Sequence, residues 1–169
     1  MHEKDVDYRV AIITVSTSRY EKYGELKGLE KIGDDDESGK LIYESFKSQA
    51  VDYRLVPDDV MEIRKAALDV LSKADVCIIT GGTGLNPTDV TIEAVEPLFT
   101  KKIDGFGEIF RMLSYEEVGF SAILSRATAG LVKDKVVFCL PGSKKAVRLG
   151  LDIIKKSLKH ILSHARGLS

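Results

Sequence analysis

The sequence predicts an α/β fold, with one three-layer domain spanning residues 1–169 and helices on both faces of a mostly parallel sheet. Strand-like apolar runs alternate along the chain with segments in which apolar residues recur at helical spacing. A chain of 169 residues, 44% of them apolar, is also long enough to bury a core and fold alone. No internal repeat, low-complexity stretch or linker interrupts it.

In the first half of the chain, Val10–Val15 is the first predicted strand. Asp36 or Ser38 can cap a helix that has Leu41, Ile42, Ser45 and Phe46 on one side. Tyr53–Val56 reads as a second strand ending at Pro57, and a helical period then runs through Val60, Ile63, Ala67, Val70 and Leu71. The coil-rich region between Arg19 and Asp36 is expected to form a mobile surface loop.

In the second half, Val76–Ile79 is a strand that leads into a glycine-rich loop and a helix ending near Phe99. Gly105–Val118 is predicted to be helical and Val136–Leu140 to be a further strand. A closing helix carries a steady apolar stripe, made of Val147, Leu151, Ile154, Leu158 and Ile161.

The glycine-rich loop is the most informative segment of the chain. It reads Thr80-Gly81-Gly82-Thr83-Gly84 and is followed by Asp89, between a strand and a helix start. Glycines let backbone N–H groups approach an anion, and the helix start adds partial positive charge. Asp89 beside a phosphate would be repulsive unless a divalent cation lay between them, which favours a magnesium-bound polyphosphate. The loop matches neither the P-loop nor the dinucleotide fingerprint, and a tight turn with Asp89 as helix cap is the alternative.

Four segments follow predicted strands and should meet at one edge of the sheet, where ligands of open parallel sheets bind. They are Thr14–Ser18, Pro57-Asp58, Thr80–Gly84 and Pro141–Ser143. Gly142-Ser143-Lys144-Lys145 would add a second helix start with cations, although a basic run is more often a solvated face. Ser16 and Thr17 are weaker candidates because hydroxyls after a first strand often serve only the turn.

Composition limits the classes of function. The formal net charge is −1 and no basic stripe is interleaved with aromatics, which argues against nucleic acid and anionic membranes as partners. Cys77 and Cys139 lie in apolar runs without metal-ligand spacing and are expected to be buried thiols of a cytoplasmic protein. The histidines, His2, His160 and His164, lie near the ends of the chain, so histidine-based catalysis is not expected.

Five ordered segments carry a family resemblance. They are Val56-Pro57-Asp58-Asp59, the glycine loop with Asp89, Gly105-Phe106-Gly107-Glu108, Leu124-Ser125-Arg126-Ala127 and Leu140-Pro141-Gly142-Ser143. Together they resemble the MoaB/Mog family of molybdenum-cofactor biosynthesis, and the Ser38-Gly39 and Ala129-Gly130 pairs are closer to MoaB than to Mog.

The resemblance implies that the protein binds molybdopterin and adenylylates its terminal phosphate with Mg-ATP. The reaction releases pyrophosphate and leaves an activated pterin, into which molybdenum or tungsten is later inserted. No tightly bound prosthetic group is expected. Asp58 and Asp89 match the functional carboxylates of the family and are assigned to catalysis and magnesium. Ser125 and Arg126 match its Ser-Arg motif, which implies contact with ligand or with a neighbouring subunit. Many relatives read Ser-Asp where this chain has Ser16-Thr17-Ser18-Arg19, so a carboxylate role in that loop does not carry over.

By the same resemblance, the chain is expected to form a homotrimer or a pair of trimers and to pass its product to a molybdenum insertase. Two alternatives to the transferase remain at this stage. One is a pterin-binding protein of the same fold without catalysis. The other is a flavodoxin-like flavin carrier, suggested by the hydroxyl-rich loop Thr14–Ser18 and disfavoured by the glycine loop.

Overall fold

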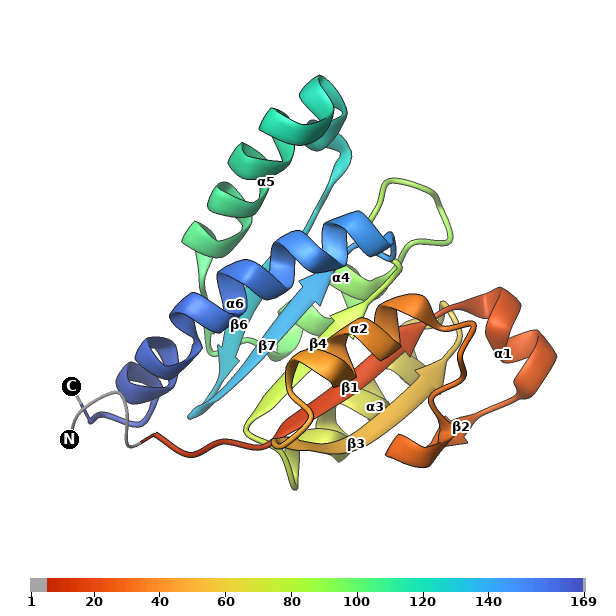
Figure 1. Ribbon diagram of the computed structural model, residues 1–169, viewed down its shortest axis with the longest axis horizontal. Coiled ribbons are helices and arrows are strands. Elements are labelled where there is room, and N and C mark those ends of the chain that lie inside the picture. Colours follow the sequence, from red (N-terminus) through yellow and green to blue (C-terminus); the bar gives the residue numbers. More distant parts are fainter. Residues whose placement is uncertain (1–5, 169) are drawn as a thin grey trace.

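A computed structural model describes residues 6–168, which form a three-layer α/β structure around one seven-stranded sheet (Figure 1). The strand order is β2-β3-β1-β4-β7-β6-β5. The strands are β1 Val10–Val15, β2 Leu26–Lys27, β3 Ala50–Val56, β4 Val76–Thr80, β5 Lys101–Lys102, β6 Thr128–Val132 and β7 Lys135–Leu140. The central strands β3, β1, β4 and β7 are parallel, whereas β2, β6 and β5 are antiparallel to their neighbours.

Helices cover both faces of the sheet, as predicted. They are α1 Thr17–Tyr23, α2 Glu37–Ser45, α3 Val60–Leu71, α4 Thr91–Val95, α5 Asp104–Val118 and α6 Lys144–Ala165, with single 3-10 turns η2 Leu29–Lys31, η3 Glu96–Leu98 and η4 Gly119–Leu124. Helices α2, α5 and α6 contribute to the apolar core on one face, and α3 and α4 to the core on the other. In Figure 1 the far end of α5 and the following segment extend beyond the sheet.

Side chains of the central strands alternate between these two cores. Ile12, Ile78 and Phe138 point to the face of α2 and α6, and Ile13, Ile79 and Cys139 to the face of α3. The prediction of buried, unpaired thiols is confirmed for Cys77 and Cys139. Burial raises the pKa of both thiols well above the ordinary value, so neither is a ready nucleophile.

Besides α1, which Ser16 caps, three helix starts are fixed by side-chain caps at the edge where the parallel strands end. Asp36, rather than Ser38, caps α2 by accepting a hydrogen bond from the backbone N–H of Gly39 at 3.0 Å. Asp59 caps α3 and Ser143 caps α6 in the same manner. The chain therefore enters each helix from this edge with a defined geometry.

The region between Arg19 and Asp36, expected to be a mobile surface loop, contains regular secondary structure. Helix α1 begins directly after its cap Ser16, and β2 and η2 follow before α2. Leu26, Leu29 and Ile32 pack against the core, and β2 pairs with Leu55 and Arg54 of β3. These contacts hold the segment against the edge of the sheet.

The antiparallel strands β5 and β6 were not among the predicted elements, and β3 starts three residues earlier than expected. Of these three residues Asp52 is charged, and it belongs to a cluster of ion pairs. Arg54 and Lys73 both contact Asp52, and Arg54 also contacts Asp69 at 2.8 Å. Within the described residues, no helix combines the length and apolar character needed to cross a membrane.

Candidate functional site

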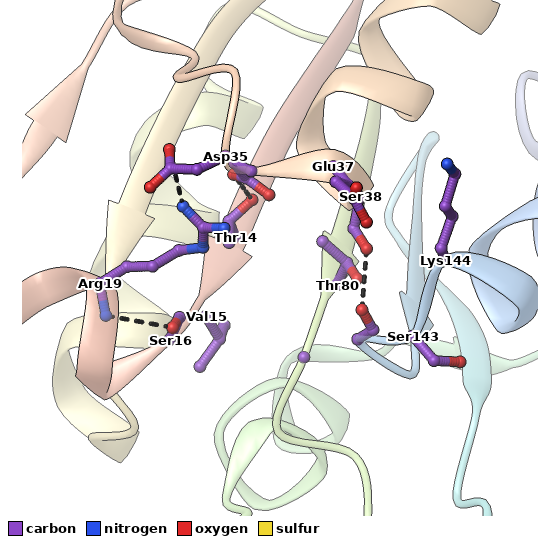
Figure 2. Close-up of a pocket in the computed structure, with 13 residues that line it drawn as sticks. Thr14, Val15, Ser16, Arg19, Asp35, Glu37, Ser38, Thr80, Ser143 and Lys144 are labelled. Atoms are coloured by element: carbon purple, nitrogen blue, oxygen red, sulfur yellow. Dashed lines mark hydrogen bonds and ion pairs between the residues drawn. The ribbon is translucent and has the colours of Figure 1, made fainter.

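The carboxyl ends of the parallel strands meet around a cleft of about 390 Å³. Residues from the loops after β1, β4 and β7 line it, together with the start of α2 (Figure 2). The lining residues are Thr14, Val15, Ser16, Arg19, Asp35, Asp36, Glu37, Ser38, Thr80, Gly81, Gly142, Ser143 and Lys144. The predicted convergence of strand-end segments at one edge is therefore present in the structure.

The glycine loop passes under this cleft in a backbone conformation that requires glycine. Gly81 has φ +100° and Gly82 has φ +70°. A Cβ at Gly81 would collide with the carbonyl oxygen of Val15, so the loop lies directly against the end of β1. The N–H of Gly81 donates to the carbonyl oxygen of Leu140 at 2.9 Å, and the hydroxyl of Thr91 donates to the carbonyl oxygen of Gly81 at 2.7 Å. The loop is thus attached to both neighbouring strand ends.

The starts of α2 and α6 form facing walls of the cleft. The hydroxyl of Ser38 donates to the carbonyl oxygen of Gly142 at 2.8 Å and joins the two walls. Thr80 supports the same segment by donating to the carbonyl oxygen of Pro141 at 3.1 Å. Lys144 lines the cleft, whereas its neighbour Lys145 is exposed and does not. Free N–H groups of a helix start beside a lysine favour an anion.

Asp36 organises the back of the cleft although it is almost fully buried. One carboxylate oxygen accepts from the hydroxyls of Thr14 at 2.7 Å and Tyr53 at 2.5 Å, and the other caps α2. Burial and the adjacent Asp36 carboxylate raise the pKa of Tyr53 far above its ordinary value, so the phenol remains a donor. The network fixes α2 against β1 and β3.

Asp58 lies at the end of β3, beside the glycine loop. Its Oδ2 accepts from the hydroxyl of Thr17 at 2.7 Å and from the backbone N–H of Thr17 at 3.3 Å. Its Oδ1 would be 3.1 Å from a Cβ at Gly82, so this oxygen faces the loop. Asp59 is the cap of α3, so Asp58 is not used to cap this helix.

Asp89 lies on the other flank of the same loop. Its Oδ2 accepts from the backbone N–H of Asn86 at 3.1 Å and would be 2.8 Å from a Cβ at Gly84. No side chain caps α4, so the alternative role of Asp89 as helix cap does not apply. Among residues 6–168 no group of three or more His, Cys, Asp or Glu side chains could hold a metal ion alone. Two separate carboxylates suit a magnesium ion that keeps water and substrate phosphates as further ligands.

Ser125 and Arg126 lie in a second cleft of about 410 Å³, lined also by Glu93 and Arg111. The Arg126 guanidinium donates to the carbonyl oxygens of Gly84 at 3.0 Å and Asp89 at 3.2 Å. It also pairs with Glu93, and this hydrogen bond holds the pKa of Glu93 below its ordinary value. The backbone N–H of Arg126 donates to the carbonyl oxygen of the buried Thr83 at 3.2 Å. Arg126 thereby fixes the glycine loop from the side away from the first cleft.

Sequence reasoning overlooked the residues that the segment before α2 brings to the first cleft. Arg19 and Asp35 line it, although they belong to the region that was expected to be a mobile loop, and Glu37 lines it from the start of α2. The one sign of these residues in the sequence was the acidic run of Asp34, Asp35, Asp36 and Glu37, which marks the segment as unusual in charge.

The comparisons with known proteins agree with this geometry. A model of a family described as a probable molybdopterin binding domain matches residues 11–160. The chain belongs to the MoaB/Mog family. It is 45% identical over 168 residues to a probable molybdopterin adenylyltransferase of Methanocaldococcus jannaschii, covering 98% of this chain and 99% of that one. It is 49% identical over 139 residues to a molybdopterin adenylyltransferase of Pyrococcus furiosus, covering 78% and 82% of the two chains.

The MoaB/Mog fold is also found in solved structures. The chain superposes on the tungsten cofactor synthesizing protein MoaB of Pyrococcus furiosus with a TM-score of 0.79 and 43% identity, covering 94% of this chain and 97% of that one. MoaB/Mog membership confirms the resemblance drawn from the five motifs. It removes the basis for a flavodoxin-like flavin carrier.

Proposed function

We propose that the protein is a molybdopterin adenylyltransferase acting in the synthesis of a molybdenum or tungsten cofactor. The observation that carries the proposal is the glycine loop, whose Gly81 lines the strand-end cleft and whose Gly82 and Gly84 lie beside the carboxylates of Asp58 and Asp89. The high identity over almost the whole length to a protein named as a probable molybdopterin adenylyltransferase supports the same reaction.

In this reaction an oxygen of the terminal phosphate of molybdopterin attacks the α-phosphorus of ATP. The bond from the α-phosphorus to the oxygen bridging to the β-phosphorus breaks, and pyrophosphate leaves. A phosphate monoester has its second pKa at about 6, so the attacking phosphate needs no strong base near neutrality. This is consistent with His160 and His164, which lie on α6 far along the helix from the cleft; His2 is outside the described residues.

The protein's part is to hold two polyanions in line. We assign the backbone N–H groups of Gly82–Gly84, Gly142 and Ser143 to phosphate binding, with the Ser16 hydroxyl beside them and Lys144 as the cation at the cleft. Gly81, Thr17 and Thr80 position this site, because the N–H of Gly81 donates to Leu140, the Thr17 hydroxyl to Asp58 and the Thr80 hydroxyl to Pro141. Pro141 positions that turn through its contact with Thr80. Arg126 holds the glycine loop from the second cleft, which Ser125 also lines, and Lys145 lies outside the lining of the first cleft.

Asp58 and Asp89 supply too few oxygen ligands to hold a magnesium ion alone. They suit an ion whose other ligands are water and the phosphates of ATP. Asp58 offers the Oδ1 that faces Gly82, and Asp89 offers an oxygen beside Gly84. Held there, Mg²⁺ would neutralise charge on the phosphates as it accumulates during transfer.

The test follows pyrophosphate release and adenylylated pterin after adding molybdopterin and Mg-ATP to the wild type, Asp58→Asn and Asp89→Asn. Each variant is expected to lose about 100-fold or more in rate, because each removes a charge that positions the phosphates. Asp59→Asn is the matched control, since asparagine caps a helix as well as aspartate does. Pterin binding without any pyrophosphate release in the wild type would instead identify a binding protein of the same fold.

We further propose that the chain assembles into a homotrimer or a pair of trimers. Exposed apolar side chains gather on α5 and η4, including Met112 at 57%, Phe120 at 76% and Ile123 at 75% exposure. Covering such a patch favours association. Light scattering of Phe120→Asp and Ile123→Asp should show smaller particles than the wild type.

We also propose that the adenylylated pterin passes to a molybdenum insertase, a transfer that a coupled metal-insertion assay would detect.

A further inference from the structure

Arg19 is a basic residue of the first cleft that the roles assigned above do not use. It lies in the first turn of α1, where its backbone N–H donates to the hydroxyl of Ser16 at 3.3 Å. In Figure 2 its side chain extends into the cleft on the side away from Lys144. Among the described residues that line the cleft, Arg19 and Lys144 are the basic ones. A ligand in the cleft would therefore have Arg19 on one side and Lys144 on the other.

A single carboxylate holds the Arg19 side chain in this position. Nη1 of Arg19 lies 3.1 Å from Oδ1 of Asp35, while the hydroxyl of Tyr23 donates to the other oxygen of Asp35 at 2.6 Å. The hydrogen bond from Tyr23, and then Arg19, lower the pKa of Asp35, so the carboxylate stays charged. The pair is partly exposed, with 26% of the Arg19 side chain and 49% of the Asp35 side chain accessible, and such pairs are weak. A guanidinium has five N–H donors and can bind a phosphate through two of them at once.

The acidic residues on this side of the cleft also favour a cation beside them. Asp35, Asp36 and Glu37 all line the cleft, although a polyanion is expected to enter it. Asp36 is buried and accepts hydrogen bonds from Thr14, Tyr53 and Gly39. Asp35 is exposed, and Arg19 stands beside it at 3.1 Å. An anion approaching from the cleft would meet less repulsion if the Arg19 side chain turned from Asp35 toward it.

We propose that Arg19 is a substrate-binding residue that exchanges Asp35 for a phosphate group of the bound substrate. The Tyr23–Asp35 pair holds the guanidinium ready in the empty cleft and gives it up when the phosphate arrives. This inference rests on the proposed function, and it names a residue outside the motifs that carry the family resemblance.

The opposite view is that the Arg19–Asp35 pair merely ties α1 to the segment before α2. The two views predict different outcomes for the two partners of one ion pair. A tie is broken equally by removing either partner, so both variants would weaken ligand binding alike. A phosphate-binding Arg19 is lost only when Arg19 is removed, whereas removal of the Asp35 charge frees the guanidinium and reduces repulsion.

The experiment measures the affinity of the full chain for inorganic pyrophosphate and for Mg-ATP by titration calorimetry. Arg19→Ala is expected to weaken binding roughly 10- to 100-fold, as for the loss of a hydrogen-bonded charge. Arg19→Lys should fall between Arg19→Ala and the wild type, because lysine keeps the charge and loses the paired donors. Asp35→Asn should bind as tightly as the wild type or several-fold tighter. Lys65→Ala, which removes an exposed charge from α3 on the opposite face of the sheet, is the matched control and should bind like the wild type.

Equal weakening in Arg19→Ala and Asp35→Asn would overturn the inference, as would unchanged affinity in Arg19→Ala or a wild type that binds neither probe. Denaturant midpoints of all variants show whether each remains folded, and Arg19→Lys keeps the test valid if Arg19→Ala is unstable. A wild type that binds Mg-ATP through Arg19 but releases no pyrophosphate with molybdopterin would disprove the proposed transfer alone. In an active enzyme, the substrate whose KM rises in Arg19→Ala identifies the phosphate that Arg19 binds.

Discussion

The two clefts beside the glycine loop contain similar residues and use them differently. In the second cleft Arg126 donates to Gly84, Asp89 and Glu93, and Arg111 donates to the carbonyl oxygen of Ala127 at 2.9 Å. In the first cleft Arg19 meets one exposed carboxylate, and Lys144 extends from the start of α6 into the lining. The arginines of the second cleft hold the protein's own backbone, whereas we propose that the cations of the first cleft bind a ligand. The role of a basic residue near a site therefore depends on whether its N–H groups already donate to the protein's own carbonyl oxygens.

The strongest way to break this comparison is to disturb the loop that separates the clefts. Gly81→Ala places a Cβ against the carbonyl oxygen of Val15 at a positive φ. We expect a loss of about 3 kcal/mol or more in the free energy of unfolding, together with loss of pyrophosphate binding. Urea denaturation measures the first effect and calorimetry the second. Gly167→Ala is the control, because Gly167 also has positive φ but has open space around it, and it should cost only about 1 kcal/mol.

Removing the arginine of the second cleft tests whether it is structural. Arg126→Ala leaves the carbonyl oxygens of Gly84 and Asp89 without their donor. The expected cost is about 2 kcal/mol of unfolding free energy. Arg148→Ala, an exposed arginine on α6, should stay within about 0.5 kcal/mol of the wild type. If Arg126→Ala were as stable as that control, the assignment of the second cleft to structure would be wrong.

The opposite pattern is expected for the lysine of the first cleft. Lys144→Ala should leave stability within about 0.5 kcal/mol and weaken pyrophosphate binding about tenfold. Lys145→Ala removes the same charge from the next position, which does not line the cleft, and should have a clearly smaller effect. Equal effects of the two variants on the affinity would mean that the cleft senses only the general charge of α6.

The smallest expected effect is a pH dependence in the second cleft. Arg126 holds the pKa of Glu93 below its ordinary value, so the pair stabilises the fold above that value, which is about 4.3 for an unperturbed glutamate. The stabilisation is lost as the pH falls through the lower pKa of the folded state. Because the pair is partly exposed, we expect Glu93→Gln to cost under about 1 kcal/mol at pH 7. The difference from the wild type should shrink as the pH falls through that lower pKa, and a difference that grew on acidification would contradict the assignment.

Most of the parallel sheet could be predicted because its central strands are apolar runs whose ends carry glycine, proline and aspartate. The rule that ligands bind at the carboxyl ends of parallel strands predicts from the sequence alone that Ser16, Thr80, Gly81 and Ser143 lie together, and all four line the first cleft. Local patterns were sufficient for these positions, since each motif follows its strand directly.

The rest depended on tertiary contacts that leave no local pattern. Helix α1 has no buried residues and therefore no apolar stripe, and β2 and β5 have two residues each. The pairing of Arg126 with Glu93 joins residues 33 positions apart, and the place of Arg19 depends on Asp35 after an intervening helix and strand. The division of the predicted site residues between two clefts could not be read from the sequence for the same reason.

The hydrogen bond from Ser38 to Gly142 closes a loop of 104 residues and joins the two walls of the first cleft. Contacts between such distant residues form late in folding, because closing a long loop costs entropy before the contact can stabilise it. A growing chain that has not yet released α6 from the ribosome lacks one wall of the cleft and has no complete place for a phosphate. The time at which pyrophosphate binding appears during refolding would therefore report when the starts of α2 and α6 come together. We expect this to follow the formation of most of the core.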